Sequence, residues 1–158
     1  MIHEILMRLP ISTRHSFRSY LLVLIQLLCL GGMVITGPVF ASRAIYVGLE
    51  LLGIALGIWA LVTMTVRNLT ILPDIRAGSP LVTHGPYRYI RHPMYTALGL
   101  LTLALLLDAF SMERLIIWGI LVGDLWIKLN YEEQLLIRHF GEYKDYQRQT
   151  KRLIPFIL

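Results

Sequence analysis

Cysteine and charge are both scarce in this sequence. Cys29 is its one cysteine, and only 16% of the 158 residues are charged. A single cysteine excludes an intramolecular disulfide framework and a cysteine-rich metal cluster, so we expect no metal site. Soluble domains average about 25% charged and about 45–50% apolar residues, whereas 56% of the residues here are hydrophobic. Because a water-soluble core could not bury this much apolar surface, we expect an integral membrane protein.

Four apolar runs are long enough to be candidate spanning helices, since a span takes about 20 mostly apolar residues. They cover residues 20–36, 44–66, 93–110 and 115–129, and the fourth is short and contains Asp124. The sequence therefore predicts an all-α integral membrane protein with about four transmembrane helices. We expect a single domain over 1–158, divided into a cytoplasmic or interfacial N-terminus (1–19), two N-terminal spans (20–66) and a region with two further spans (67–158).

The distribution of basic residues predicts the orientation of these spans. Only two basic residues, Arg43 and Arg114, lie in the connectors that follow the first and third spans. The other connector and both termini hold most of the rest, including Arg8, Arg14, Arg18, Arg67, Arg76, Arg88, Arg91, Arg138, Lys144, Arg148, Lys151 and Arg152. Since basic residues collect on the cytoplasmic side, both termini should be cytoplasmic. This placement also explains the net charge of +5 without a nucleic-acid partner.

Small residues and one N-terminal segment give weaker signals. The glycine pairs Gly53/Gly57 and Gly119/Gly123 are each spaced four residues apart. This spacing lets helix backbones approach closely, so we expect both pairs to pack within the bundle. The apolar residues of segment 1–9 recur at helical spacing, which fits either an interfacial helix or a frayed terminus.

The connector before the third span has the local signals of a binding site. Gly85-Pro86 predicts a turn and the start of a short helix, which should end near Arg91 because the residue before Pro93 avoids helical geometry. Two helix N-termini and the basic side chains Arg88, Arg91 and His92 should then lie together, an arrangement that favours a carboxylate or phosphate. The alternative is that these basic residues only anchor the helix at lipid headgroups.

A second polar segment, 128–141, follows the fourth span. Glu132 and Glu133 lie at the bilayer boundary, where ionisable groups are costly and are often functional. Adjacent helix residues point about 100° apart, so we expect one glutamate to bind a ligand and the other to pair with a basic residue. Asp124 and Lys128 have the spacing of a helical ion pair. The role of Glu50, inside the second span, stays open.

These motifs together resemble the isoprenylcysteine carboxyl methyltransferase family, and phospholipid N-methyltransferases belong to the same broader group. The resemblance covers residues 81–155, nearly half of the chain. It is carried by Leu81-Val82-Thr83-x-Gly85-Pro86-Tyr87, Arg91-His92-Pro93-x-Tyr95, Glu132-Glu133, Phe140-Gly141-x-Tyr143-x-x-Tyr146 and Arg152-Leu153-Ile154-Pro155.

The resemblance implies S-adenosylmethionine as methyl donor, bound in a cytoplasmic pocket formed by the 67–93 connector and the C-terminal helix. We expect cofactor-binding residues at Leu81, Val82, His84, Gly85, Tyr87, Arg91, His92, Pro93, Tyr95, Glu132 and Glu133. Arg91 and Glu132 are the candidate catalytic residues. Lys128 and Asn130 are candidate substrate-binding residues, and Lys128 stands where the eukaryotic carboxyl methyltransferases have an arginine.

The expected function is methyl transfer to a small amphipathic or lipid-like acceptor, whose nucleophile could be a carboxylate, an amine or a thiol. S-adenosylhomocysteine would be the product. Two alternatives stay open: an NADPH-dependent membrane reductase of the sterol type, which has a similar His-Pro-x-Tyr segment, and a non-catalytic membrane protein. The compact chain favours a prokaryotic inner or plasma membrane, and the sequence does not indicate an oligomeric state.

Overall fold

The regular elements in the described part of the chain are helices. A computed structural model describes residues 17–64 and 80–154, and within these ranges the β-structure is one isolated parallel bridge between Ile90 and Lys151. The elements are α2 (Phe17–Ile35), α3 (Ala44–Met64), the short 3-10 helix η1 (Gly85–Arg88), α4 (Pro93–Asp108), α5 (Met112–His139) and α6 (Tyr143–Gln149).

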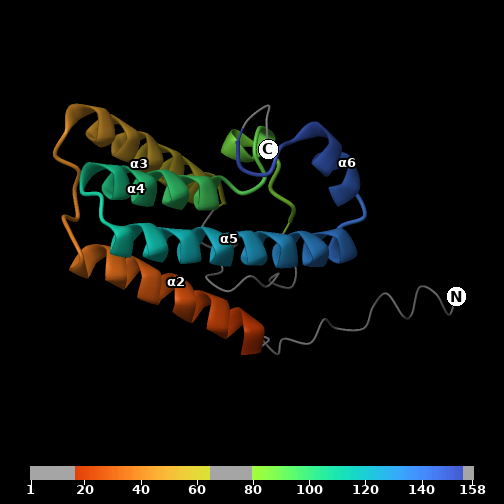
Figure 1. The fold of residues 1–158 in the computed structure, drawn as a ribbon. Helices are drawn as coiled ribbons and strands as arrows, with labels where there is room; N and C mark the ends of the chain where they lie inside the picture. The colour runs from red at the N-terminus through yellow and green to blue at the C-terminus, as the bar shows by residue number, and fades with distance from the viewer. Residues whose placement is uncertain (1–16, 65–79, 155–158) are drawn as a thin grey trace, which may run out of the picture.

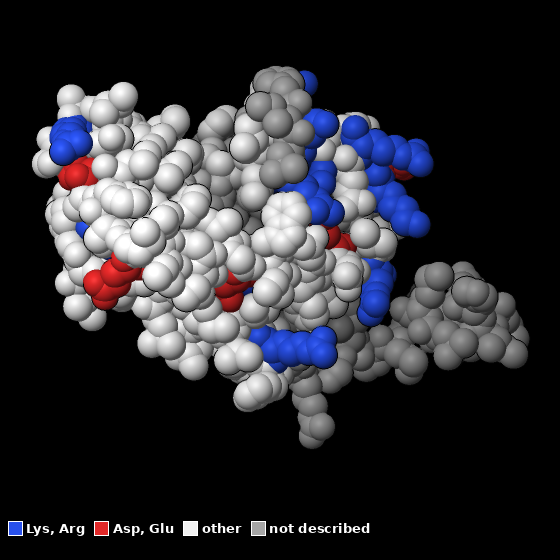
Figure 2. All heavy atoms as spheres, in the orientation of Figure 1, with Lys and Arg blue, Asp and Glu red and all other residues white. Residues whose placement is uncertain are grey.

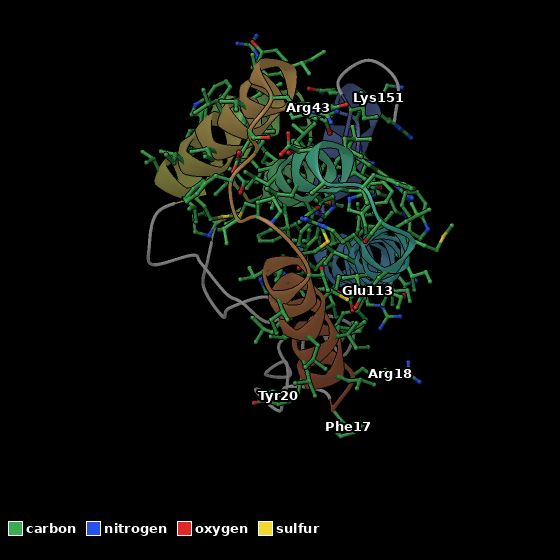
Figure 3. All side chains as sticks on the ribbon, turned by 60° about the vertical axis from the view of Figure 1, so that its left-hand side comes forward. Phe17, Arg18, Tyr20, Arg43, Glu113 and Lys151 are labelled. Carbon is green, nitrogen blue, oxygen red and sulfur yellow. The ribbon has the colours of Figure 1, made fainter. Side chains whose placement is uncertain are left out.

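The four long helices run up and down beside one another (Figure 1). The helix α5 lies in the middle, with the tightly packed pair α3 and α4 on one side and α2 on the other (Figures 1 and 3). One end of the bundle carries η1, α6 and the end of the described chain, and the opposite end carries the α2–α3 and α4–α5 connections. The described parts of the segments predicted to be cytoplasmic therefore share one end.

Two of the helices are long and apolar enough to cross a membrane, namely α2 with 19 residues and α3 with 21. The apolar helix α4 is shorter, at 16 residues, and α5 carries charged residues along its length. Large apolar side chains such as Leu28, Ile58, Val62 and Ile127 are more than half exposed. An apolar exterior of this kind suits a lipid environment. The structure thus supports two spans, and the four-span topology stays a prediction.

Side chains from neighbouring segments fix where the helices begin. The Asp108 carboxylate, at the end of α4, accepts hydrogen bonds from the backbone N–H groups of Ser42 (2.9 Å) and Arg43 (3.0 Å) just before α3. It thereby caps the N-terminus of α3 from another helix. Ser111 caps α5 by accepting from the Arg114 N–H (3.2 Å). Glu50 is buried and accepts from the Ala41 N–H (2.9 Å), which gives that residue a structural role at the same end.

One predicted helix end is wrong, and another helix is longer than the apolar run that predicted it. The short helix expected to reach Arg91 ends at Arg88, and the backbone groups of Tyr89, Arg91 and His92 pair instead with the C-terminal segment. The last apolar run, expected to be a short span over 115–129, belongs to a helix of 28 residues that continues to His139. Glu132 and Glu133 consequently lie on the same rigid element as the apolar run.

The two glycine pairs behave differently. A Cβ at Gly53 would lie 3.0 Å from the Ala97 carbonyl oxygen and 3.1 Å from the Leu101 nitrogen, so this glycine lets α3 approach the backbone of α4. At Gly119 and Gly123 the same Cβ would meet nothing within 4 Å among the described residues. The expected packing is confirmed at Gly53 and wrong for the α5 pair.

Segment 1–9 lies outside the described residues, as do residues 67–79 of the 67–93 connector.

Basic side chains gather at the end of the molecule that carries α6 and the C-terminal segment (Figure 2). At the opposite end, acidic side chains are visible beside few basic ones in this view. The charge asymmetry read from the sequence is therefore present in space, on the end that the positive-inside rule would place in the cytoplasm.

Candidate functional site

Three segments that are far apart in the chain meet at the basic end of the bundle. The backbone N–H of Arg91 donates to the Lys151 carbonyl (2.8 Å), and the N–H of His92 donates to the Arg152 carbonyl (3.1 Å). In return, the Lys151 N–H donates to the Tyr89 carbonyl (3.1 Å). The His-Pro turn before α4 is thus held by backbone hydrogen bonds to the segment that follows α6, and both lie against the end of α5.

Arg91 uses most of its donors inside the protein. Its Nε donates to the Glu133 carboxylate (2.7 Å). Its Nη1 donates to the backbone carbonyls of Gln147 and Thr150 and to the Thr150 hydroxyl. Such a charge-assisted network fixes the guanidinium. Arg91 therefore joins the turn, α5 and the C-terminal segment, and this geometry gives it a positioning role.

Glu133 is the buried member of the glutamate pair, with a side chain only 4% exposed. It pairs with Arg91 and, at 3.0 Å, with the Nη2 of Arg152, while the His92 ring lies 3.5 Å away. Burial alone would raise the pKa of Glu133, but the interactions with His92 and Arg91 outweigh it and lower this pKa to about 2. Glu133 is therefore ionised and held by basic partners.

Glu132 is the accessible member of the pair, with 25% of its side chain exposed. It accepts a hydrogen bond from the Tyr95 hydroxyl and lies 3.5 Å from the Nδ1 of His92. The His92 and Tyr95 rings are stacked, with centroids 5.5 Å apart. Burial opposes the charged form of His92, yet the carboxylates of Glu132 and Glu133 on either side raise its pKa overall.

Several buried polar atoms around these residues have no hydrogen-bond partner in the described part of the chain. They are the hydroxyls of Tyr87 and Tyr143 and the Nε2 of His92. Burial and neighbouring carboxylates raise the pKa of both tyrosines, so their hydroxyls are neutral donors. Unsatisfied buried polar groups are uncommon and often mark a place where a ligand or ion belongs.

The structure brings together five of the predicted cofactor-binding residues: Arg91, His92, Tyr95, Glu132 and Glu133. Tyr87 and Pro93, which lie close to these residues in the sequence, are also buried. Gly85 has a positive φ of 60°, and a Cβ there would lie 2.6 Å from the Thr63 hydroxyl oxygen, so only glycine fits this turn against α3. Leu81 and Val82 are half-buried and His84 is exposed ahead of that turn.

The predicted substrate residues have different surroundings. Lys128 is buried, and its Nζ donates to the Gln26 side-chain oxygen on α2 (2.6 Å). Asn130 donates to the Trp126 carbonyl (2.9 Å) and accepts from Arg152 (3.3 Å). The expected Asp124–Lys128 pair forms no hydrogen bond, since both Asp124 oxygens lack a hydrogen-bond partner among the described residues, but the two side chains do interact electrostatically.

Sequence reasoning missed Thr150 and Arg152 as parts of this site, together with Gln26. Arg152 reaches Glu133 and also lies over the Trp126 ring, with its guanidinium carbon 5.5 Å from the ring centroid. Its place in the closing Arg152-Leu153-Ile154-Pro155 motif was a usable signal. Gln26 offered none, because it is a single amide in an apolar run.

Comparisons with known proteins give one family and one curated relative. The model of the phospholipid methyltransferase family matches residues 41–143. The nickel-cobalt-cadmium resistance protein NccN of Alcaligenes xylosoxydans xylosoxydans is 29% identical over 82 residues, which are 51% of this chain and 38% of that protein. This chain therefore matches well under half the length of that relative. Among the described residues, no group of three or more His, Cys, Asp or Glu side chains is placed to hold a metal ion.

Proposed function

This chain belongs to the phospholipid methyltransferase family, which includes the isoprenylcysteine carboxyl methyltransferases, and we propose that it is an S-adenosylmethionine-dependent methyltransferase acting on a lipid-like acceptor. The family is one of membrane methyltransferases, and the two apolar helices α2 and α3 agree with a membrane location. The observation that carries the proposal is the contrast between the two neighbouring glutamates. The Glu133 carboxylate is buried and paired with basic side chains, while the Glu132 carboxylate is partly exposed.

The residues around Glu132 fit the proposed cofactor. Its partly exposed carboxylate suits an ammonium group or ribose hydroxyls, which are donors. The buried, unpaired hydroxyls of Tyr87 and Tyr143 and the Nε2 of His92 offer further polar contacts. Arg152 is one-third exposed in its side chain and is a cation available to a carboxylate. The cofactor supplies an activated methyl group on a sulfonium, which makes a covalent enzyme intermediate unnecessary.

The protein's own contribution would be positioning and exclusion of water. Arg91 and Thr150 fix the turn against α5, so the Glu132 carboxylate has a defined place relative to Tyr95 and His92. Holding two reactants in line supplies much of the rate of a displacement reaction. The apolar exterior of the bundle would let a lipid-like acceptor approach from the bilayer, and the basic end would admit the cofactor from the cytoplasm.

Equilibrium binding of S-adenosylhomocysteine to the purified full chain tests the proposal. We expect Glu132→Gln to weaken this binding by about tenfold or more, as the loss of a charge-assisted contact does. Glu142→Gln is the matched control, because Glu142 is an exposed glutamate at the start of α6. It should bind like the wild type.

The same measurement separates the proposal from the reductase alternative. Tight binding of NADPH with no binding of S-adenosylhomocysteine would refute a methyltransferase. Binding of neither ligand by a well-folded protein would favour a non-catalytic membrane protein. A screen with radiolabelled S-adenosylmethionine over lipid extracts would then report the acceptor directly.

A further inference from the structure

The surface around the candidate site is strongly basic. Figure 2 shows basic side chains gathered at the end of the molecule that carries α6. Among the described residues at this end, exposed basic residues outnumber exposed acidic ones by five to two. The basic residues are Arg88, Arg138, Lys144, Arg148 and Lys151, and the acidic residues are Glu142 and Asp145. A surface with this excess of positive charge attracts anions.

Two of these basic residues, Arg88 and Lys151, have no acidic neighbour to neutralise them. Arg148 does have one, since its Nη1 lies 3.3 Å from the Asp145 carboxylate. In the described part of the chain, no carboxylate lies within ion-pair distance of the Arg88 or Lys151 side chain. Both side chains are exposed, so a charged group can reach them from outside the protein without entering a cavity.

Large exposed apolar side chains accompany these two cations. Tyr89, next to Arg88, is 50% exposed, and Ile154, three residues after Lys151, is 46% exposed. At a bilayer surface, aromatic and aliphatic side chains enter the headgroup boundary while neighbouring cations contact the phosphates. The apolar helices α2 and α3 support a membrane location. This mixture of cations and apolar groups therefore fits anionic lipid headgroups better than it fits a soluble acidic protein.

The backbone of the same two segments holds the candidate site together. The Lys151 N–H donates to the Tyr89 carbonyl (3.1 Å), and the Lys151 carbonyl accepts from the Arg91 N–H (2.8 Å). The next residue, Arg152, reaches Glu133 at 3.0 Å. We refer to this arrangement of the 89–92 turn and the 150–152 segment as the paired form. A ligand on the Lys151 side chain contacts a residue whose own backbone makes the pairing.

We infer that anionic lipid headgroups bind Arg88 and Lys151, stabilise the paired form, and thereby raise the affinity of the site for its cofactor. This inference rests on the proposed function and concerns the regulation of that site. A ligand that binds the paired form better than the separated form shifts the equilibrium towards pairing by the difference in affinity. Because such coupling is reciprocal, bound cofactor should strengthen the lipid contact by the same factor.

Nanodiscs of two compositions test the inference with the full chain. One bilayer is phosphatidylcholine alone, and the other is an equal mixture of phosphatidylcholine and phosphatidylglycerol. We expect S-adenosylhomocysteine to bind about fivefold more tightly in the anionic bilayer, the effect of roughly one contact between a cation and a headgroup. Amide hydrogen exchange gives a second measurement that needs no cofactor. The amides of Arg91 and Lys151 donate across the pairing, so their exchange should be slower in the anionic bilayer.

Substitutions of the two cations test the residues themselves. Lys151→Gln should bind S-adenosylhomocysteine like the wild type in phosphatidylcholine, because its side chain makes no contact in the candidate site, and should lose most of the gain in the anionic bilayer. Adding Arg88→Gln should remove the rest of that gain. Arg43→Gln is the matched control, since Arg43 is exposed just before α3 at the opposite end of the bundle. It also meets lipid headgroups but is remote from the pairing, so it should keep the full gain.

Three results would overturn the inference. One is a wild type that binds S-adenosylhomocysteine equally well in the two bilayers. Another is a gain that the variant lacking both cations retains in full. The third is an equal gain when polyaspartate is added to phosphatidylcholine nanodiscs, which would point to an acidic protein as the partner. Absence of binding in both bilayers would instead refute the proposed function, and amide exchange would still show whether anionic lipid stabilises the paired form.

Discussion

Replacing Glu133 with glutamine should lower the stability of the folded protein, whereas the same change at Glu132 should alter it little. Glu133 is sealed among Arg91, Arg152 and His92, with a side chain only 4% exposed. Glutamine keeps the size of the side chain but removes its charge. Arg91 and His92 would then be left buried beside a neutral group, which is costly.

The size of the effect follows from the pKa of Glu133. Its interactions lower that pKa from 4.5 to about 2, and each unit corresponds to about 1.4 kcal/mol. The ionised Glu133 therefore contributes about 3 kcal/mol at neutral pH, within the range for breaking a buried ion pair. For a chain of this size, such a loss lowers the melting temperature by roughly 6–12 °C.

Glu132→Gln provides the contrast. Its side chain is 25% exposed, and a glutamine oxygen can still accept from the Tyr95 hydroxyl. We expect a loss of stability below about 1 kcal/mol, since partly exposed charged contacts contribute little. Thermal unfolding of both variants in detergent, followed by circular dichroism, measures the difference. Equal destabilisation by the two substitutions would contradict the assignment of one sealed and one accessible glutamate.

Two further predictions concern acid stability and helix packing. A carboxyl group with a lowered pKa stabilises the folded state fully above about pH 4.5 and loses this contribution as the pH falls towards 2, so the melting difference between wild type and Glu133→Gln should shrink over that interval; a constant difference would point to another cause. Gly53→Ala should destabilise by roughly 1–3 kcal/mol, because its Cβ would press on the α4 backbone at 3.0 Å. Gly57→Ala is the matched control, because its added Cβ would make an ordinary contact at 3.4 Å. Denaturant titration of both variants in detergent measures their free energies of unfolding, and equal values would contradict the close approach at Gly53.

Much of the helical layout could be predicted because it depends on local signals. The apolar runs predicted the ends of α2 and α3 to within about three residues, since the bilayer requires long uninterrupted stretches. Pro93 marked the first residue of α4, as expected from its fixed φ angle. The end of α5 was not predictable in this way, because the helix continues through a polar sequence that periodicity in hydrophobicity does not mark.

The site was only partly predictable because its geometry depends on contacts between distant segments. The pattern around His92 indicated which residues come together, but it could not say which of Glu132 and Glu133 pairs with basic residues. That distinction depends on Arg152 and Thr150, which are distant in the sequence. Backbone hydrogen bonds between the C-terminal segment and the turn place them at the site. Pairing of this kind leaves no local signature in the sequence.

The direction of each side chain on α5 explains why one helix can serve two interfaces. Residues four apart on a helix drift by about 40° around its axis, so a polar row at this spacing winds slowly across the surface. Lys128 contacts Gln26 on α2 and lies over Tyr95 on α4, whereas Glu132, one step further, contacts Tyr95. The row therefore moves from the α2 side to the α4 side as it approaches the basic end. A rigid helix of this length keeps the buried polar groups and the accessible glutamate in fixed register, which a loop after a short span could not do.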